Sequence, residues 1–146
     1  MRKNFPYVGA SYLLLIEDDK ILLQRRHQTG YMDGKYGVPA GHLDGGETAK
    51  EGCAREIKEE IGIDVKTENL EVVHTMFRKA EDSERIDFFM TTTSYEGEVK
   101  NCESDKCDDL GWFPLNDLPK NTIDYVKSAI ELHVKGITYS EFGWDD

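Results

Sequence analysis

The sequence predicts a mixed α/β fold in which short strands surround one central helix and a second helix follows near the end. Short apolar or alternating segments stand on both sides of residues 49–61, and helix start and stop signals bound that segment. A second helical pattern covers about residues 123–134. Strands interrupted by helices favour α and β layers around a sheet. The length of 146 residues predicts one domain over residues 1–146.

The first strands are expected to form a hairpin. Residues 7–17 are apolar and aromatic and predict a buried strand, Asp18 and Asp19 predict a turn, and residues 20–26 predict the returning strand. A loop is expected over residues 28–35, which contain Gly30, Asp33 and Gly34. Short extended pieces at residues 36–38 and 42–44 precede the central helix.

The central helix has the clearest boundaries in the sequence. Thr48 is a good N-cap and Glu51 follows three residues later, which is the pattern of a capping box. Gly62 is a good terminator, so the helix is expected from about Ala49 to Ile61. Apolar side chains recur every fourth residue and predict a buried stripe: Cys53, Ile57 and Ile61.

The second half of the chain returns to strands. Residues 70–77 and 86–94 predict two strands joined by a polar loop, and residues 97–109 are expected to be polar and irregular in structure. A strand is expected at residues 110–114. Thr122 is then predicted to cap the final helix, about residues 123–134.

Composition excludes several classes of function. The formal net charge is −11, from 18 basic and 29 acidic side chains, and such a surface repels nucleic-acid backbones and anionic membranes. The longest apolar run, residues 12–16, is too short to span a membrane or to form the core of a signal peptide. Three cysteines fit a reducing compartment. We therefore expect a cytoplasmic protein with no membrane partner and no nucleic-acid polymer as partner.

Three glutamates of the central helix lie beside its buried stripe. At about 100° per residue, Glu56, Glu59 and Glu60 share an arc of roughly 100°. Like charges this close repel, and proximity to the core is expected to make this repulsion more costly. A divalent cation would remove the conflict, and a cluster of carboxylate oxygens suits Mg²⁺ or Mn²⁺. The alternative is the solvated acidic face of an ordinary helix.

Two neighbouring features favour the metal site over that alternative. Gly41, Gly45 and Gly46 allow a tight turn before the helix, whose backbone groups can approach a ligand closely. Arg55 stands one turn before Glu59 and can pair with it or with Glu56, which would hold the carboxylates in place.

Residues 41–63 resemble the Nudix box of the Nudix hydrolase family. That box reads Gly, five residues, Glu, seven residues, then Arg-Glu-aliphatic-x-Glu-Glu-x-Gly-aliphatic, and every fixed position is present: Gly41, Glu47, Arg55, Glu56, Ile57, Glu59, Glu60, Gly62 and Ile63. Residues 36–40 resemble the family's lead-in, with Val38 and Ala40 in place of the usual Leu and Gly. Residues 111–115 and 118–119 resemble its last strand and turn, so most of residues 8–134 fit.

The resemblance implies an α/β/α sandwich with a mixed sheet between helices. It also implies Mg²⁺-dependent hydrolysis of a pyrophosphate bond in a nucleoside diphosphate derivative. The catalytic residues would be Arg55, Glu56, Glu59 and Glu60, and the last three would bind the metal together with the carbonyl of Ala40. Glu47 would support these ligands, and the resemblance does not decide which glutamate acts as base.

Other site residues are expected outside the box. A later loop usually adds a ligand or base, for which Glu103 is the candidate, the alternative being an ordinary loop carboxylate. Gly41 and one of Arg25 and Arg26 are expected to contact substrate, because neighbours on a strand face opposite sides. Asn121 stands where triphosphate-cleaving relatives read the base, and its alternative role is a cap beside Thr122.

The residues beyond the box bear on the substrate class, because they lack two markers of known subfamilies. ADP-ribose pyrophosphatases carry a Pro, and dinucleoside polyphosphate hydrolases a Tyr, at a set distance beyond the box, and residues 77–81 contain neither. This favours a nucleoside triphosphate, including oxidised or non-standard ones. The alternatives are another nucleoside diphosphate-linked substrate, or a non-catalytic Nudix regulator that binds a nucleotide without cleaving it. Analogy with the family also suggests a homodimer.

Overall fold

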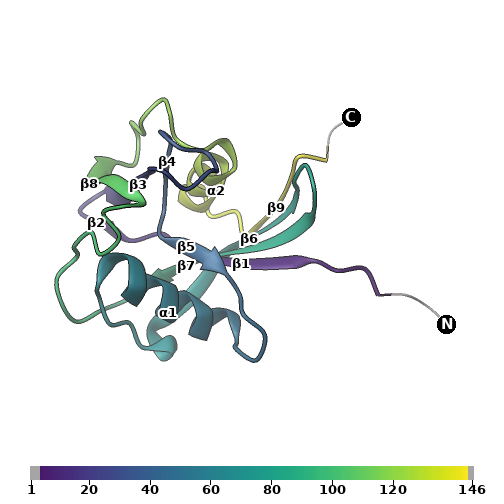
Figure 1. Cartoon of the computed structure of the whole chain (residues 1–146), viewed down its shortest axis with the longest axis horizontal. Helices are drawn as coiled ribbons and strands as arrows, with labels where there is room; N and C mark the ends of the chain where they lie inside the picture. The colour runs from purple at the N-terminus through teal and green to yellow at the C-terminus, as the bar shows by residue number, and fades with distance from the viewer. Residues whose placement is uncertain (1–3, 145–146) are drawn as a thin grey trace.

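Residues 4–144, the part that the computed structural model describes, form two β-sheets and two α-helices (Figure 1). The larger sheet has the strand order β5-β1-β7-β6-β9. It is mixed, because β1 and β7 run parallel, as do β6 and β9, whereas the other two pairings are antiparallel. Its strands are β1 (Val8–Leu13), β5 (Ala40–His42), β6 (Leu70–Lys79), β7 (Glu84–Thr92) and β9 (Tyr139–Phe142).

The smaller sheet is antiparallel and is centred on β3, which pairs with its three neighbours. Its strands are β2 (Ile16–Glu17), β3 (Lys20–Arg26), β4 (Tyr36–Gly37) and β8 (Cys107–Pro114). The expected turn at Asp18 and Asp19 is confirmed, since both residues have the positive φ that a tight hairpin turn requires.

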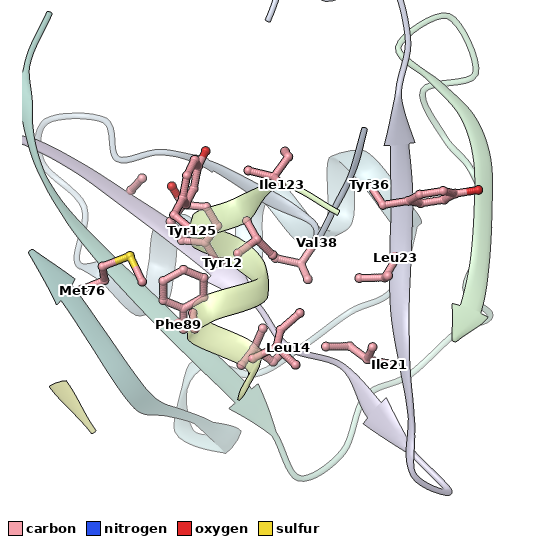
Figure 2. Close-up of a cluster of buried hydrophobic side chains, with 14 residues drawn as sticks. Tyr12, Leu14, Ile21, Leu23, Tyr36, Val38, Met76, Phe89, Ile123 and Tyr125 are labelled. Carbon is pink, nitrogen blue, oxygen red and sulfur yellow. The ribbon is translucent and has the colours of Figure 1, made fainter. Parts of the chain in front are cut away.

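The two helices cover opposite faces of the larger sheet. Helix α1 (Ala49–Ile61) packs with Leu13 and Met90, whereas α2 (Asp124–Val134) packs with the neighbouring residues Tyr12 and Phe89, which point the other way. Figure 2 shows α2 with side chains from both sheets around it, among them Phe89 and Leu23. The predicted mixed sheet between helices is therefore confirmed, and the second sheet is an addition to it.

Helix α1 has the predicted boundaries. Its capping box is complete, because Thr48 accepts a hydrogen bond from the backbone of Glu51 while the Glu51 side chain accepts one from Thr48. Gly62 ends the helix with φ 77°, in the left-handed region. The predicted stripe is buried: Cys53, Ile57 and Ile61.

The single strand predicted over residues 7–17 is wrong, because the chain changes sheets within it. It leaves the larger sheet after Leu13 and joins the smaller one at Ile16. Leu14 and Leu15 between them are buried in different clusters of the core, so the apolar run continues although the strand does not. Apolar content alone could not reveal this break.

Thr122 does not cap the last helix. Its hydroxyl donates to the carbonyl of Pro119, and Ile123 occupies the N-cap position without a capping side chain. A short 3-10 helix, η1 (Thr67–Asn69), precedes β6.

Several strand positions also differ from expectation. The extended piece expected at residues 42–44 lies two residues earlier and forms β5. β8 begins at Cys107 rather than at residue 110. β7 likewise begins and ends two residues earlier than expected, and β9 was not predicted. Pairing with distant strands fixes these positions. Within residues 4–144, no helix combines the length and apolar character needed to cross a membrane.

Candidate active site

A polar cleft of about 350 Å³ lies where α1 meets β3, β5 and the loop before β8. It brings together most of the predicted site residues, although they come from four separate parts of the chain. These are Arg25, Arg26, Ala40, Glu56, Glu59, Glu60 and Glu103.

Glu60 is the buried carboxyl group of this cleft. It accepts hydrogen bonds from the side-chain amide of Gln24 at 2.8 Å and from the backbone N–H of Ala40 at 3.3 Å. Burial raises the pKa of Glu60 to about 8, and the adjacent Glu56 carboxyl group adds to the increase. A buried carboxylate beside a second one is stable only when a cation or a proton compensates the charge.

Arg55 holds the other acidic groups of the box in fixed positions. Its Nε and Nη2 atoms donate to both carboxylate oxygens of Glu47, at 3.1 and 2.8 Å, and its Nη1 donates to Glu56 at 2.9 Å. These hydrogen bonds lower the pKa of Glu47 to about 2. Glu59 is farther from the guanidinium, at 3.7 Å, and its side chain is half exposed. Arg55 therefore connects the turn before the helix with the helix itself.

Gly41 lies in β5 rather than in the expected turn, and it allows this strand to approach the helix closely. A methyl group at this position would overlap the side chain of Glu56, well inside van der Waals contact. Only glycine thus permits Glu56 to lie beside the backbone of β5. Gly45, in the turn that follows β5, has open space around it.

The donor set of the cleft fits a hard divalent cation. Four carboxylates line it together with Ala40, three of them from α1 and the fourth from Glu103, and the buried Glu60 needs a compensating charge. Among residues 4–144, however, no three Asp, Glu, His or Cys side chains already stand close enough to hold one ion. Side-chain rotation, above all of the half-exposed Glu59, would be required to close the site.

Arg25 and Arg26 both line the cleft, which differs from the expectation that only one would. The pairing of β3 with β8 shifts register between them, so that Asp108 of β8 has no partner on β3. Such a bulge redirects side chains at this point of the sheet. Arg25 Nε is held by Asp108 at 2.7 Å, and Arg26 Nε donates to the carbonyl of Tyr31 at 2.6 Å.

The two candidates outside the box have different surroundings. Glu103 lines the cleft, in a loop that Asn101 shapes by accepting a hydrogen bond from the Glu103 N–H and donating one to the Cys107 carbonyl. Asn121 donates to the carbonyl of Gly34 at 2.8 Å and is not among the residues that line the cleft. Its visible role is to anchor the loop before β4, so the structure does not bring Asn121 together with the site.

Two further cavities lie in a row beside the cleft. The first, about 290 Å³, shares Arg26 and Ala40 with it and includes Gly41. The second, about 530 Å³, shares Tyr31, Arg85 and Tyr125 with the first, and we call it the aromatic chamber. Because they share lining residues, the three spaces are neighbours, and we refer to them together as the groove.

Sequence reasoning missed some residues of this groove. Gln24 could have been found, because it is a polar residue that follows the apolar run Ile21–Leu22–Leu23 in a predicted strand. Tyr125 and Arg78 carry no comparable local signal, since an aromatic residue in a helix and an arginine in a strand are common on any protein.

Comparison with known proteins agrees with the geometry. The family model described as "NUDIX domain" matches residues 6–131. An NAD-capped RNA hydrolase, NudC, of Pseudomonas fluorescens is 29% identical over 118 residues, which are 80% of this chain and 40% of that protein. An ADP-ribose pyrophosphatase of Methanocaldococcus jannaschii is 32% identical over 114 residues, 78% of this chain and 66% of that one.

The structural comparison points the same way. A MutT NUDIX hydrolase from Burkholderia pseudomallei superposes with a TM-score of 0.78 at 26% identity, covering 86% of this chain and 97% of that one. The chain spans only about two fifths of the length of the NudC relatives. The family model nevertheless matches most of the chain, and the fold and the box residues agree with it: the chain belongs to the Nudix hydrolase family.

Proposed function

We propose that this chain hydrolyses a pyrophosphate bond in a nucleoside diphosphate derivative with Mg²⁺ as cofactor, and that its substrate is a nucleoside triphosphate, cleaved to the monophosphate and pyrophosphate. One observation carries the proposal. The buried carboxyl group of Glu60 lies in one cleft with Glu56, Glu59 and two arginines, so that groups for a cation and groups for an anion face the same space.

Each residue of the box has a separate role in this proposal. Glu56, Glu59, Glu60 and the carbonyl of Ala40 bind the metal, with Glu103 as a further ligand or base. Bound Mg²⁺ would neutralise charge on the phosphates and lower the pKa of the attacking water. Arg55 holds Glu56 at the required position, and Glu47 in turn holds Arg55 through two hydrogen bonds. The choice of base among the glutamates stays open.

The two arginines explain how a protein with a large negative charge could bind a polyphosphate. With a net charge of −11, the protein as a whole repels the substrate. Arg25 and Arg26 of β3 place two positive charges in the same cleft as the carboxylates of α1. They would bind the phosphate oxygens that face away from the metal, since guanidinium groups match phosphate geometry.

The rest of the groove supplies space for the nucleoside. With phosphates in the cleft, the ribose would occupy the first cavity and the base would reach the aromatic chamber. Tyr31 is half exposed there and offers an aromatic surface to a base. Gly41, which lines the first cavity, would contact the substrate through its backbone.

ADP-ribose is a second candidate substrate, favoured by the 32% identity to an ADP-ribose pyrophosphatase. The names of the NudC relatives also make NAD-capped RNA a substrate worth testing against the expectation that no nucleic-acid polymer binds. A regulator that binds without cleavage is disfavoured by the presence of every box glutamate. The homodimer and the cytoplasmic location stay predictions.

Product analysis on a substrate panel separates these possibilities. The purified chain is incubated with nucleoside triphosphates, ADP-ribose, NAD and NAD-capped RNA, with Mg²⁺ or with EDTA. Release of pyrophosphate from a triphosphate, dependent on Mg²⁺, supports the proposal, whereas AMP from ADP-ribose alone moves the assignment to the second candidate. Nucleotide binding without any turnover would identify a regulator instead.

A further inference from the structure

A buried polar cluster lies behind the aromatic chamber, outside the carboxylate cleft. Arg78 of β6 and Asp87 of β7 form an ion pair at 2.6 Å, with 4% and 0% of their side chains exposed. Tyr12 of β1 donates to the other oxygen of Asp87 at 2.9 Å. The guanidinium carbon of Arg78 lies 3.7 Å from the centre of the Tyr125 ring, in α2. Four elements thus hold the guanidinium group in one orientation.

This cluster presents a hydrogen-bond donor to the chamber. Arg78 uses Nε for Asp87 and Nη2 for a long contact of 3.4 Å to the Tyr12 hydroxyl, and within residues 4–144 Nη1 has no recorded partner. Nη1 is also not sealed in the core, since Ser11 Oγ is the one fully buried side-chain polar atom without a partner in that part of the chain. Arg78 is among the residues that line the chamber.

The same cluster presents no acceptor of its own to the chamber, because Asp87 is fully buried, and the carboxylates that line the chamber, Glu81 and Asp82, stand apart from it on the loop between β6 and β7. Tyr12 occupies one carboxylate oxygen of Asp87 and Arg78 the other. A ligand ring that reaches this wall therefore meets an N–H group, which pairs with a carbonyl oxygen and leaves an amino group unpaired. The guanidinium cannot lose its proton, so its donor character does not change with pH in the working range.

We propose that Arg78 is a specificity-determining residue, whose free guanidinium nitrogen donates to a keto oxygen on the substrate base and so favours keto bases over amino bases. This inference rests on the proposed function, because it places the phosphates in the carboxylate cleft. It names the substrate class more closely: nucleotides of hypoxanthine, guanine or uracil. It also makes adenine compounds, ADP-ribose included, poor substrates.

Two matched nucleotide pairs test the proposal. ITP and ATP differ at the edge of the purine ring, where a keto oxygen replaces an amino group, and UTP and CTP form the corresponding pyrimidine pair. We expect kcat/KM with Mg²⁺ to be about tenfold or more higher for the keto member of each pair, as for other guanidinium contacts that discriminate between base edges. Equal values for both members would overturn the proposal.

The variant Arg78→Lys separates recognition from structure. Lysine keeps a positive charge for Asp87 but lacks the planar fork that reaches two groups at once. We expect the ITP-to-ATP ratio to fall towards one. A mere structural defect would lower both rates and leave the ratio unchanged, which would contradict the proposal. The matched control is Arg85→Lys, because Arg85 lines the same chamber and donates through Nε to Ser83 and through Nη1 to His42. We expect this variant to retain the ratio, and loss of the ratio in Arg85→Lys alone would assign the contact to Arg85 and overturn the proposal.

Binding measurements keep this test independent of turnover. Calorimetry with IMP and AMP on the wild-type chain should show tighter binding of IMP, by a factor similar to the kinetic one. If no nucleotide is hydrolysed but IMP still binds more tightly, the proposed function fails and the role of Arg78 stands. If hydrolysis occurs and IMP and AMP bind equally, the role of Arg78 fails and the proposed function stands.

Discussion

Glu60 shows how one buried side chain links the stability of this fold to its proposed chemistry. The carboxyl group gains two hydrogen bonds, from Gln24 and from the backbone of Ala40, but it is taken out of water next to Glu56. Burying charge in this way costs free energy unless a cation compensates it. The position therefore favours an uncharged side chain in the metal-free protein and a carboxylate in the metal-bound enzyme.

The variant Glu60→Gln tests this conflict directly. Glutamine keeps an acceptor for Gln24 and Ala40 but cannot carry the charge, so we expect hydrolysis to fall at least about 100-fold. The thermal unfolding midpoint without metal should be equal or higher, because no charge is buried. Pyrophosphate release and circular dichroism measure the two effects. The control is Glu68→Gln, an exposed glutamate of η1, and wild-type activity in Glu60→Gln would contradict the assignment.

Gly41 in β5 and Gly45 in the turn after it offer a matched pair of substitutions. A methyl group at position 41 must displace Glu56, whereas one at position 45 meets open space. We expect Gly41→Ala to reduce kcat/KM at least about tenfold, the lower end for misplaced metal ligands, and Gly45→Ala to leave it within about twofold. Steady-state kinetics with Mg²⁺ measures both. Equal losses in the two variants would mean that the whole segment from β5 to the turn is sensitive, and not the contact with Glu56.

Residues were predictable from the sequence where the signal is local. The box glutamates and Arg55 share one helix, and the helical period alone places them together beside the buried stripe. Strand alternation predicted that only one of Arg25 and Arg26 would face the cleft, because it does not reveal the bulge opposite them at Asp108. Tyr12 and Asp87 are 75 residues apart in the sequence, and no local pattern around either residue predicts their hydrogen bond.

Among the elements, α1 is the one whose boundaries follow most directly from its own residues. Thr48 and Glu51 satisfy terminal N–H groups from within the helix sequence, and Gly62 ends the helix, although the N–H groups of a later loop also donate to its last carbonyls. Strand positions lack such signals: β5 is defined by its pairing with β1, and β9 exists because it adds to the edge of β6. Their bounds therefore required the tertiary structure.

The capping box of α1 makes a measurable contribution to stability. Thr48→Ala removes the acceptor for the Glu51 N–H, and we expect the free energy of unfolding to decrease by about 1 kcal/mol. Urea denaturation measures the change. Thr67→Ala is the control, because Thr67 is an exposed residue at the start of η1, and it should change stability by less than about 0.5 kcal/mol. A Thr48→Ala variant as stable as the wild type would show that tertiary packing alone sets the start of the helix.

At the scale of the whole molecule, the acidic surface and the proposed metal site both make stability depend on cations. A net charge of −11 produces self-repulsion in the folded state, and any salt relieves part of it by screening. A specific site acts differently, since it responds to the identity of the ion and saturates. Simple addition of MgCl₂ therefore cannot distinguish the two effects.

Comparison at matched ionic strength separates screening from binding. At a Mg²⁺ concentration of 100 times the Kd, a single site present only in the folded chain adds about 2.7 kcal/mol to the free energy of unfolding. We expect this gain over NaCl of equal ionic strength for the wild type and for Glu68→Gln, and its loss in Glu60→Gln, as measured by urea denaturation. Equal stabilisation by MgCl₂ and NaCl in all three proteins would mean that the acidic surface alone responds, and that the carboxylates of α1 hold no ion of their own.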